Sequence, residues 1–353
     1  MASSVNFSQN SYAGEVLEDL LTYTAQGNDT YQEGLIHIKS GIQHKYTIPS
    51  IQLGSIIQDN KPTPTSTEGA GSSGKNEYMF TERTLEPQEF MVYLEFNPRD
   101  YEKYYKFAQP DGNLVFRELD PKVQAKMLRL LMDKKNEYIG ESIWCSAKGG
   151  ESAANITVPA NCTKIGGDNA GGKMKYFDGV MKRILANTAT GASSAEKAGG
   201  QVVMAGDTEL TTGEEVEKAL NAMWKKCPKP IRKKAGLVFV CGWDVWDLYD
   251  QYLSDKQAKY SDNTKVNEYR FKGKRIVPIV GIPEHTIVLG EFTTGQESNL
   301  WMGVDYANDS EVVKVERLQN NSELYFFLMR MKMDVNIVRP AEIVCHTAYK
   351  NAG

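Results

Sequence analysis

The stretch from Gly69 to Asn76 comes closer than any other part of the sequence to a recognisable site for chemistry. It fits the phosphate-loop pattern G-x-x-x-x-G-K, except that asparagine replaces the final Ser or Thr. A phosphate loop follows a buried strand and opens a helix, which aims backbone N–H groups at the phosphates. Here a Pro/Thr-rich linker precedes the motif and Glu-Tyr-Met-Phe follows it. This context favours a flexible surface loop, with an α+β enzyme that uses Gly69–Lys75 as the alternative.

The other reactive residue types show no catalytic or metal-binding spacing. The four histidines form no H-E-x-x-H pair, and the sequence has no G-x-S-x-G elbow. The five cysteines include no C-x-x-C pair, which argues against a disulfide framework or a zinc knuckle and favours a reducing compartment. We therefore expect no catalytic residue, no metal and no cofactor.

One basic cluster could hold phosphate or an acidic partner. It consists of Lys225, Lys226, Lys229, Arg232, Lys233 and Lys234. Cations also favour a helix C-terminus and the loop beyond it, and we prefer this second interpretation. Over the whole chain, 41 basic and 45 acidic residues give a net charge of −4, so no broad electrostatic footprint for nucleic acid is expected.

The bulk properties indicate a globular chain with no membrane partner. Its 353 residues are enough for about two or three folding units. No run of 18 apolar residues is present, and the N-terminus lacks the basic patch and apolar core of a signal peptide.

Residues 46–98 contain strand-like runs around a long tip at 59–76. The tip is rich in Pro, Thr, Ser and Gly and has no large apolar residue. Loops longer than about 12–15 residues are uncommon inside compact domains unless they are functional or disordered. A two-stranded ribbon is marginal in water unless its apolar face packs on something. We therefore expect this ribbon to reach another copy of the chain.

The remaining elements predict an α+β fold without internal repeats. Asp120-Pro121 signals the start of a long helix, about 121–143, and Thr212-Gly-Glu-Glu215 is a capping box. A second helix is expected at 176–185 and a short buried strand at 237–241. The alternation from Phe327 to Val335 predicts a strand whose apolar face is buried under the long helix.

Taken in order, these parts resemble the major capsid proteins of tailed bacteriophages, which have the HK97-type fold. The shared organisation is a polar arm, a ribbon with a flexible tip, a spine-like helix, an α/β stretch and a long return strand. The phrases that carry the resemblance are Arg83-Thr-Leu85-Glu-Pro87, Phe90–Pro98, Phe177–Lys182, Leu237–Val240, Val277–Pro283 and Leu324–Ile337.

The resemblance implies a domain layout. It comprises an N-terminal arm at 1–45, an extended β-ribbon loop at 46–98, a peripheral domain at 99–175 and 319–353 with its spine helix at 121–143, and an axial domain at 176–318.

The resemblance also implies function and partners. Subunits would assemble as hexamers and pentamers into an icosahedral head around packaged double-stranded DNA, which they contact non-specifically. The head would be built in the host cytoplasm and persist as the virion capsid. The prototype carries a long N-terminal scaffolding segment, whereas the arm here begins near Met1, so a separate scaffolding protein is implied, with a portal and decoration proteins as further partners. An encapsulin-like nanocompartment shell is the alternative with the same fold.

If the chain forms a shell, assembly contacts are expected on ribbon residues that one subunit leaves unburied. These are Ile51, Leu53, Ile56, Tyr78 and Phe80, with Glu82 and Arg83 as intersubunit ion-pair partners. An Arg83→Glu substitution is expected to block assembly without unfolding the monomer.

Overall fold

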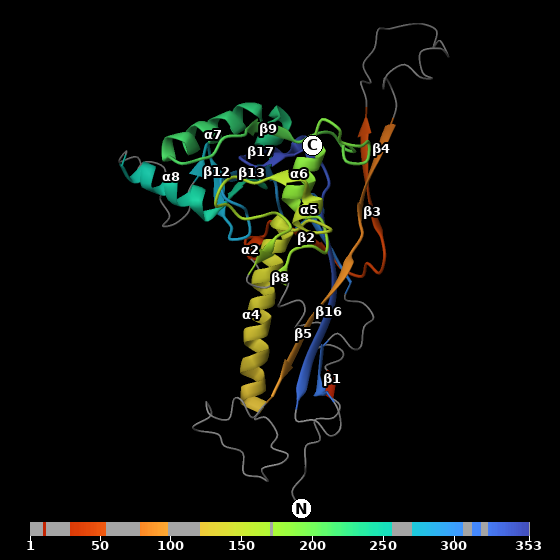
Figure 1. The fold of residues 1–353 in the computed structure, drawn as a ribbon. Helices are drawn as coiled ribbons and strands as arrows, with labels where there is room; N and C mark the ends of the chain where they lie inside the picture. Colours follow the sequence, from red (N-terminus) through yellow and green to blue (C-terminus); the bar gives the residue numbers. More distant parts are fainter. Residues whose placement is uncertain are drawn as a thin grey trace, which may run out of the picture.

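A computed structural model shows two sheets stacked along the molecule, with a long helix beside the lower one and a ribbon rising at one edge (Figure 1). The structure describes residues 10–11, 29–53, 78–97, 121–169, 172–255, 270–305, 313–318 and 324–352. The proposed tip at 59–76, with Gly69–Lys75, lies outside these residues, as do Ile56 and most of the arm.

Helices occupy the middle of the chain. Their bounds are α2 Asp29–Gln32, α4 Pro121–Cys145, α5 Glu151–Ala154, α6 Val180–Thr188, α7 Gly213–Lys226 and α8 Trp243–Asp255, with 3-10 turns η3 at Lys229–Lys233 and η4 at Pro340–Glu342. The long helix and the capping box at Thr212 are confirmed: the Thr212 hydroxyl accepts from the Glu215 N–H, and the Glu215 carboxylate accepts in return. In the described part of the chain, no helix is both long and apolar enough to cross a membrane.

The predicted start of the second helix at Tyr176 is wrong. The helix α6 begins at Val180, after an extended Gly179. The carbonyl of Phe177 accepts from the Ser146 hydroxyl at 2.7 Å, and a Cβ at Gly179 would lie 2.9 Å from the Trp144 carbonyl oxygen. Contact with the end of α4 therefore holds this segment in a turn that local periodicity does not reveal.

The long sheet is built around one strand, β16 (Tyr325–Ile337). Its order is β1-β15-β16-β14-β2, and β5 also pairs with β16. The other strands are β1 Asn10–Ser11, β15 Val313–Arg317, β14 Leu300–Val304, β2 His37–Lys39 and β5 Gln88–Phe96. On β16, Phe327, Met329, Met333 and Val335 are buried, as the alternation predicts. Phe90, directly opposite Met331, packs against Tyr138 of α4 with ring centroids 6.0 Å apart.

The upper sheet has the order β11-β12-β10-β13-β17-β9. Its strands are β11 Arg270–Phe271, β12 Lys274–Pro278, β10 Leu237–Cys241, β13 Thr286–Glu291, β17 Val344–Thr347 and β9 Val203–Gly206. The predicted strand at 237–241 is confirmed, and all five of its residues are buried. Alternate residues enter different apolar clusters. Leu237 and Phe239 pack under α7 and α8, whereas Val238 and Val240 pack toward α4 and α6. Burial on both faces explains the continuous apolar run.

The remaining strands form three two-stranded pairs. These are β3 (Tyr46–Leu53) with β4 (Tyr78–Leu85), β6 (Ile156–Thr157) with β18 (Lys350–Asn351), and β7 (Asp168–Asn169) with β8 (Gly172–Lys173).

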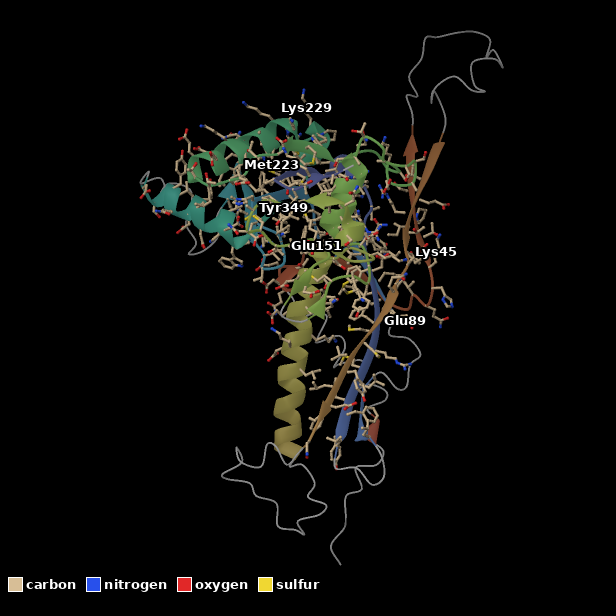
Figure 2. The ribbon with its side chains drawn as sticks, viewed as in Figure 1. Lys45, Glu89, Glu151, Met223, Lys229 and Tyr349 are labelled. Atoms are coloured by element: carbon tan, nitrogen blue, oxygen red, sulfur yellow. The ribbon has the colours of Figure 1, made fainter. Side chains whose placement is uncertain are left out.

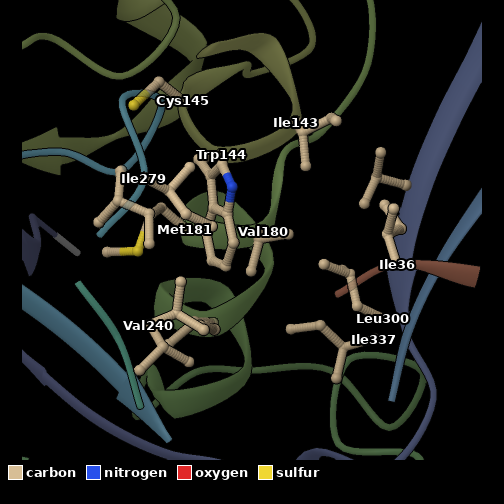
Figure 3. Packing of buried hydrophobic residues seen from close by; sticks show 14 of the residues in the cluster. Ile36, Ile143, Trp144, Cys145, Val180, Met181, Val240, Ile279, Leu300 and Ile337 are labelled. Carbon is tan, nitrogen blue, oxygen red and sulfur yellow. The ribbon is translucent and has the colours of Figure 1, made fainter. Parts of the chain in front are cut away.

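The main core joins both sheets at the end of α4. Figure 3 shows Trp144 among Ile279, Met181 and Val180, with Leu300 of the long sheet nearby. The Trp144 indole N–H donates to the Thr30 hydroxyl at 3.0 Å, so its buried polar atom is satisfied. At Gly281, an added Cβ would lie 2.2 Å from the Gly140 carbonyl oxygen, so glycine permits the close approach of the β12–β13 loop to α4.

His346 on β17 is a buried histidine whose protonation we expect to destabilise the fold. Its Nε2 lies 3.0 Å from the Thr208 carbonyl, and its buried Nδ1 has no partner among the described residues. Burial lowers the pKa of His346 below 6.5, against the raising effects of the Thr208 carbonyl and Asp207. The unfolded chain therefore binds the proton more readily. The stability that the neutral ring contributes is fully present above the unfolded pKa and is lost as the pH falls from that value through the lower folded pKa.

We expect the free energy of unfolding to fall as the pH drops below about 6.5, and His346→Gln to reduce this dependence. Glutamine can donate to the Thr208 carbonyl but does not titrate. Urea titrations across the range test this, and the same acid sensitivity in both proteins would contradict it.

Candidate assembly surface

The ribbon formed by β3 and β4 rises along one edge of the molecule (Figure 1). Its register runs from Tyr46 opposite Leu85 to Leu53 opposite Tyr78. Residues directly opposite one another lie on the same face of an antiparallel pair, and successive pairs alternate between faces. The register therefore divides the ribbon into two faces with different residues.

The inner face holds the ribbon to its own subunit. It contains the pairs Tyr46–Leu85 and Ile48–Arg83. Ile48 and Leu85 are buried with Ile42, Trp301 and Val338 in a small apolar cluster.

The outer face carries the residues that the sequence marked as assembly contacts. It contains the pairs Pro49–Glu82, Ile51–Phe80 and Leu53–Tyr78. At the base of this face, Pro49 and Glu82 are exposed. The register thus brings four of the predicted apolar positions together with Glu82 and places Arg83 on the opposite face.

Arg83 anchors the ribbon within the subunit. Its Nη2 donates to the carbonyls of Glu196 and Ala198 at 2.8 and 2.6 Å, and its Nε donates to Ala198 at 3.0 Å. Burial, and then the nearby Arg183, lower the pKa of Arg83 to about 10, so the guanidinium stays charged at neutral pH. Charge-assisted hydrogen bonds of this kind are among the stronger ones in proteins. The intersubunit pairing of Arg83 with Glu82 stays a prediction; an Arg83 variant would also disturb this anchor.

The loop that receives Arg83 is itself held by Asn187 of α6. The Asn187 Nδ2 donates to the carbonyls of Glu196 and Gly200 at 2.5 and 3.0 Å, and its Oδ1 accepts from the Val202 N–H at 2.7 Å. Asn187 is 2% exposed, so these bonds form out of water. Its role was not predicted, because an asparagine inside a helix gives no signal of a distant loop.

A second buried network joins the chain beyond the ribbon to β16. Asp334 accepts from Arg183 Nη2 at 2.8 Å and from the Glu86 N–H at 2.8 Å, and Asn336 donates to the Thr84 carbonyl at 2.7 Å. Burial raises the pKa of Asp334, although Arg183 beside it acts in the opposite direction. The polar residues of β16 near its end therefore face the ribbon base instead of solvent, which their alternation with apolar residues does not reveal.

The basic cluster is divided between internal and exposed cations. The Arg232 Nη2 donates to the Trp224 and Cys227 carbonyls, which end α7, and the Lys226 Nζ donates to the Met204 carbonyl. Lys234 Nζ lies 2.6 Å from a Glu291 carboxylate oxygen. The Arg232 contacts agree with the interpretation that cations favour a helix C-terminus, whereas Lys226 and Lys234 bind neighbouring strands. Lys225, Lys229 and Lys233 are exposed and make no ion pair with other described residues.

The five cysteines, all of which lie in the described part of the chain, include no activated thiol. Burial raises the pKa values of the Cys145, Cys241 and Cys345 thiols, and a protonated thiol is a poor nucleophile. In the same part of the chain, no three His, Cys, Asp or Glu residues lie close enough to hold a metal ion.

Nearly the whole chain is similar in structure to a known capsid subunit. A chain of the satellite phage P4 procapsid, in a structure that includes the size determination (Sid) protein, superposes with a TM-score of 0.53. The match covers 97% of this chain and 93% of that chain at 12% identity. This chain has the HK97-type capsid fold.

Other structures are similar over most of the HK97-type chain. The capsid of an empty GTA particle matches at 11% identity, covering 98% of this chain and 94% of that chain, with a TM-score of 0.49. A holo-SrpI encapsulin complex from Synechococcus elongatus PCC 7942 matches at 10% identity, covering 98% and 91%, with a TM-score of 0.43. No family model matches the sequence, and no curated protein does. The likeness to the P4 procapsid chain, at 12% identity and a TM-score of 0.53, establishes the fold alone.

Proposed function

We propose that this protein is a structural shell subunit, without catalytic activity, that assembles into hexamers and pentamers to form the icosahedral head of a tailed phage. One observation carries the proposal: Ile48 and Leu85 on one face of the ribbon pack into their own subunit, and the register assigns Ile51, Leu53, Tyr78 and Phe80 to the opposite face. Four large apolar residues gathered on one face are typical of a protein–protein contact.

The energetics suit assembly by many small contacts. Obligate interfaces bury about 2,000–5,000 Å² or more. Apolar area contributes roughly 25 cal/mol per Å² before the costs of ordering are subtracted. When this burial is divided among several neighbours, each single contact stays weak enough to be corrected, while the closed shell is cooperative.

The proposal includes the domain layout expected from the resemblance. Residues 1–45 would be the arm and 46–98 the extended loop. Residues 99–175 and 319–353 would form a peripheral domain, and 176–318 an axial domain near the symmetry axes of the capsomers.

The partners follow from the same proposal. The interior would enclose double-stranded DNA without gripping it, which a net charge of −4 allows. A separate scaffolding protein and a portal would act during assembly in the host cytoplasm, and decoration proteins could bind the finished virion.

The test is to express the chain alone and with its neighbouring reading frames, and to examine the large fraction by negative-stain electron microscopy. Closed icosahedral shells, or rings of five and six subunits, are expected. A monomer or dimer under all conditions would overturn the proposal and return attention to Gly69–Lys75, where nucleotide binding with Lys75→Ala as the control would be measured.

The contents of the particles separate the two shell functions. Particles recovered from infected or induced host cells are expected to protect double-stranded DNA from DNase. Particles that instead enclose an enzyme and no DNA would identify a nanocompartment.

A further inference from the structure

Two surfaces of opposite charge lie on the layer formed by α7, α8 and η3. The first, the basic end, consists of Lys225, Lys229 and Lys233, which follow one another from the last turn of α7 through η3. All three are exposed, and their ammonium groups make no ion pair with other described residues. Figure 2 shows Lys229 at the outer side of this layer. Three cations so close together, without an ion pair to another described residue, repel one another, so an acidic partner would lower the local electrostatic free energy.

The second surface, the acidic stripe, consists of Trp243, Asp247, Gln251 and Asp255 on α8. Their spacing of four residues places successive members on one side of the helix, and all four are exposed. The helix contains four aspartates and no lysine or arginine. Trp243 is 49% exposed, and an exposed indole one turn from a carboxylate suits a lysine ammonium through both a cation–π contact and an ion pair.

The two surfaces lie apart on the same subunit. The start of α7 packs against the second half of α8: a Cβ at Gly213 would lie 2.2 Å from the Tyr252 Cβ, and the Tyr252 hydroxyl donates to Glu217 at 2.6 Å. The basic end follows the other end of α7, about 20 Å along a helix of 14 residues. In Figure 1, α8 projects at the edge of the molecule opposite the ribbon. The basic end therefore cannot neutralise the outer part of the acidic stripe within one subunit.

We propose that the basic end of one subunit docks on the acidic stripe of the next copy around each ring, an inference that rests on the proposed shell function. A ring is closed by heterologous contacts, in which one surface of each subunit meets a different surface of its neighbour. Complementary charges at such a contact set the register and reject wrong pairings. The contact orders subunits within a capsomer, separately from the outer face of the ribbon.

The test uses two subunits with reversed charges. The all-acidic subunit carries Lys225→Glu, Lys229→Glu and Lys233→Glu, and the all-basic subunit carries Asp247→Lys and Asp255→Lys. Each subunit alone is expected to raise the critical concentration for assembly about tenfold or more, because every ring contact pairs like charges. A subunit with all five changes is expected to assemble close to the parent level, since its charges are exchanged and still complementary.

An equimolar mixture of the two reversed subunits gives a sharper result. They must alternate around a ring, which is possible with six members and impossible with five. The mixture is expected to form six-membered rings or sheets by negative stain, without pentamers or closed shells.

Matched controls separate the effect of charge pairing between the two surfaces from effects on folding and from the overall net charge. Surface changes of this kind usually alter stability within about 0.5 kcal/mol, which thermal unfolding of each variant checks. A subunit with Lys148→Glu, Lys173→Glu and Lys272→Glu has the same change in net charge as the all-acidic subunit, but outside both surfaces, and is expected to assemble as the parent does. If the parent assembles and both reversed subunits assemble equally well, the docking is wrong and the shell function stands. A parent that never assembles overturns the proposed function itself.

Discussion

A Phe80→Asp subunit is expected to fold and to form no closed shells. By register, Phe80 lies opposite Ile51 on the ribbon face that also carries the exposed Pro49 and Glu82. A carboxylate there would be buried without a partner at every equivalent contact, and burying an unpaired charge is strongly unfavourable. Because the shell is cooperative, the penalty is repeated around the particle. Sedimentation and negative-stain microscopy of the purified protein measure the result.

The matched control is Gln52→Asp, which adds the same charge one position from Ile51, on the opposite face. This subunit is expected to assemble, and thermal unfolding of both variants should match the parent. Normal shells from Phe80→Asp would contradict the proposal that the outer face makes the assembly contact. Loss of shells in both variants would show that charge anywhere on the ribbon is harmful and that the face has no special role.

An Arg183→Met subunit is expected to lose about 3–5 kcal/mol of its free energy of unfolding, because removing one partner of a buried ion pair leaves an uncompensated charge. Asp334 has a side chain only 4% exposed and depends on Arg183 Nη2 at 2.8 Å. Methionine replaces most of the aliphatic part of the arginine side chain. The decrease in the free energy of unfolding should therefore come mainly from the removed charge. Urea unfolding followed by tryptophan fluorescence measures it.

Two comparisons identify the unpaired charge as the cause. Adding Asp334→Asn to Arg183→Met should recover part of the lost stability, since asparagine is neutral and can still accept from the Glu86 N–H. The deficit of Arg183→Met should also shrink as the pH is lowered, because burial already raises the pKa of Asp334 and protonation removes the charge. Purely additive effects, or a deficit that grows in acid, would contradict this explanation.

Local signals in the sequence determined most of the elements. Asp120-Pro121 and the stripe that follows define α4, the capping box starts α7, and alternation defines β16. The ribbon was predictable because strand-forming runs flank a tip without apolar residues. These features depend on neighbours within a few residues, for which backbone geometry and capping are sufficient physical causes. Assembly contacts on the ribbon followed from the same reasoning, as apolar positions that a two-stranded ribbon cannot bury by itself.

Only the tertiary structure decided which face of the ribbon is available and what holds it. Ile51 and Arg83 both belong to the ribbon in the sequence, but the register puts them on opposite faces, and Arg83 reaches carbonyls more than a hundred residues away. Asp334 and Asn336 alternate with apolar residues along β16, yet both are buried and bond to the backbone of Glu86 and Thr84. The sequence by itself thus determined elements and their composition. Long-range pairings required the folded chain, because a buried polar group must find a partner and the sequence does not encode locally which distant backbone will provide it.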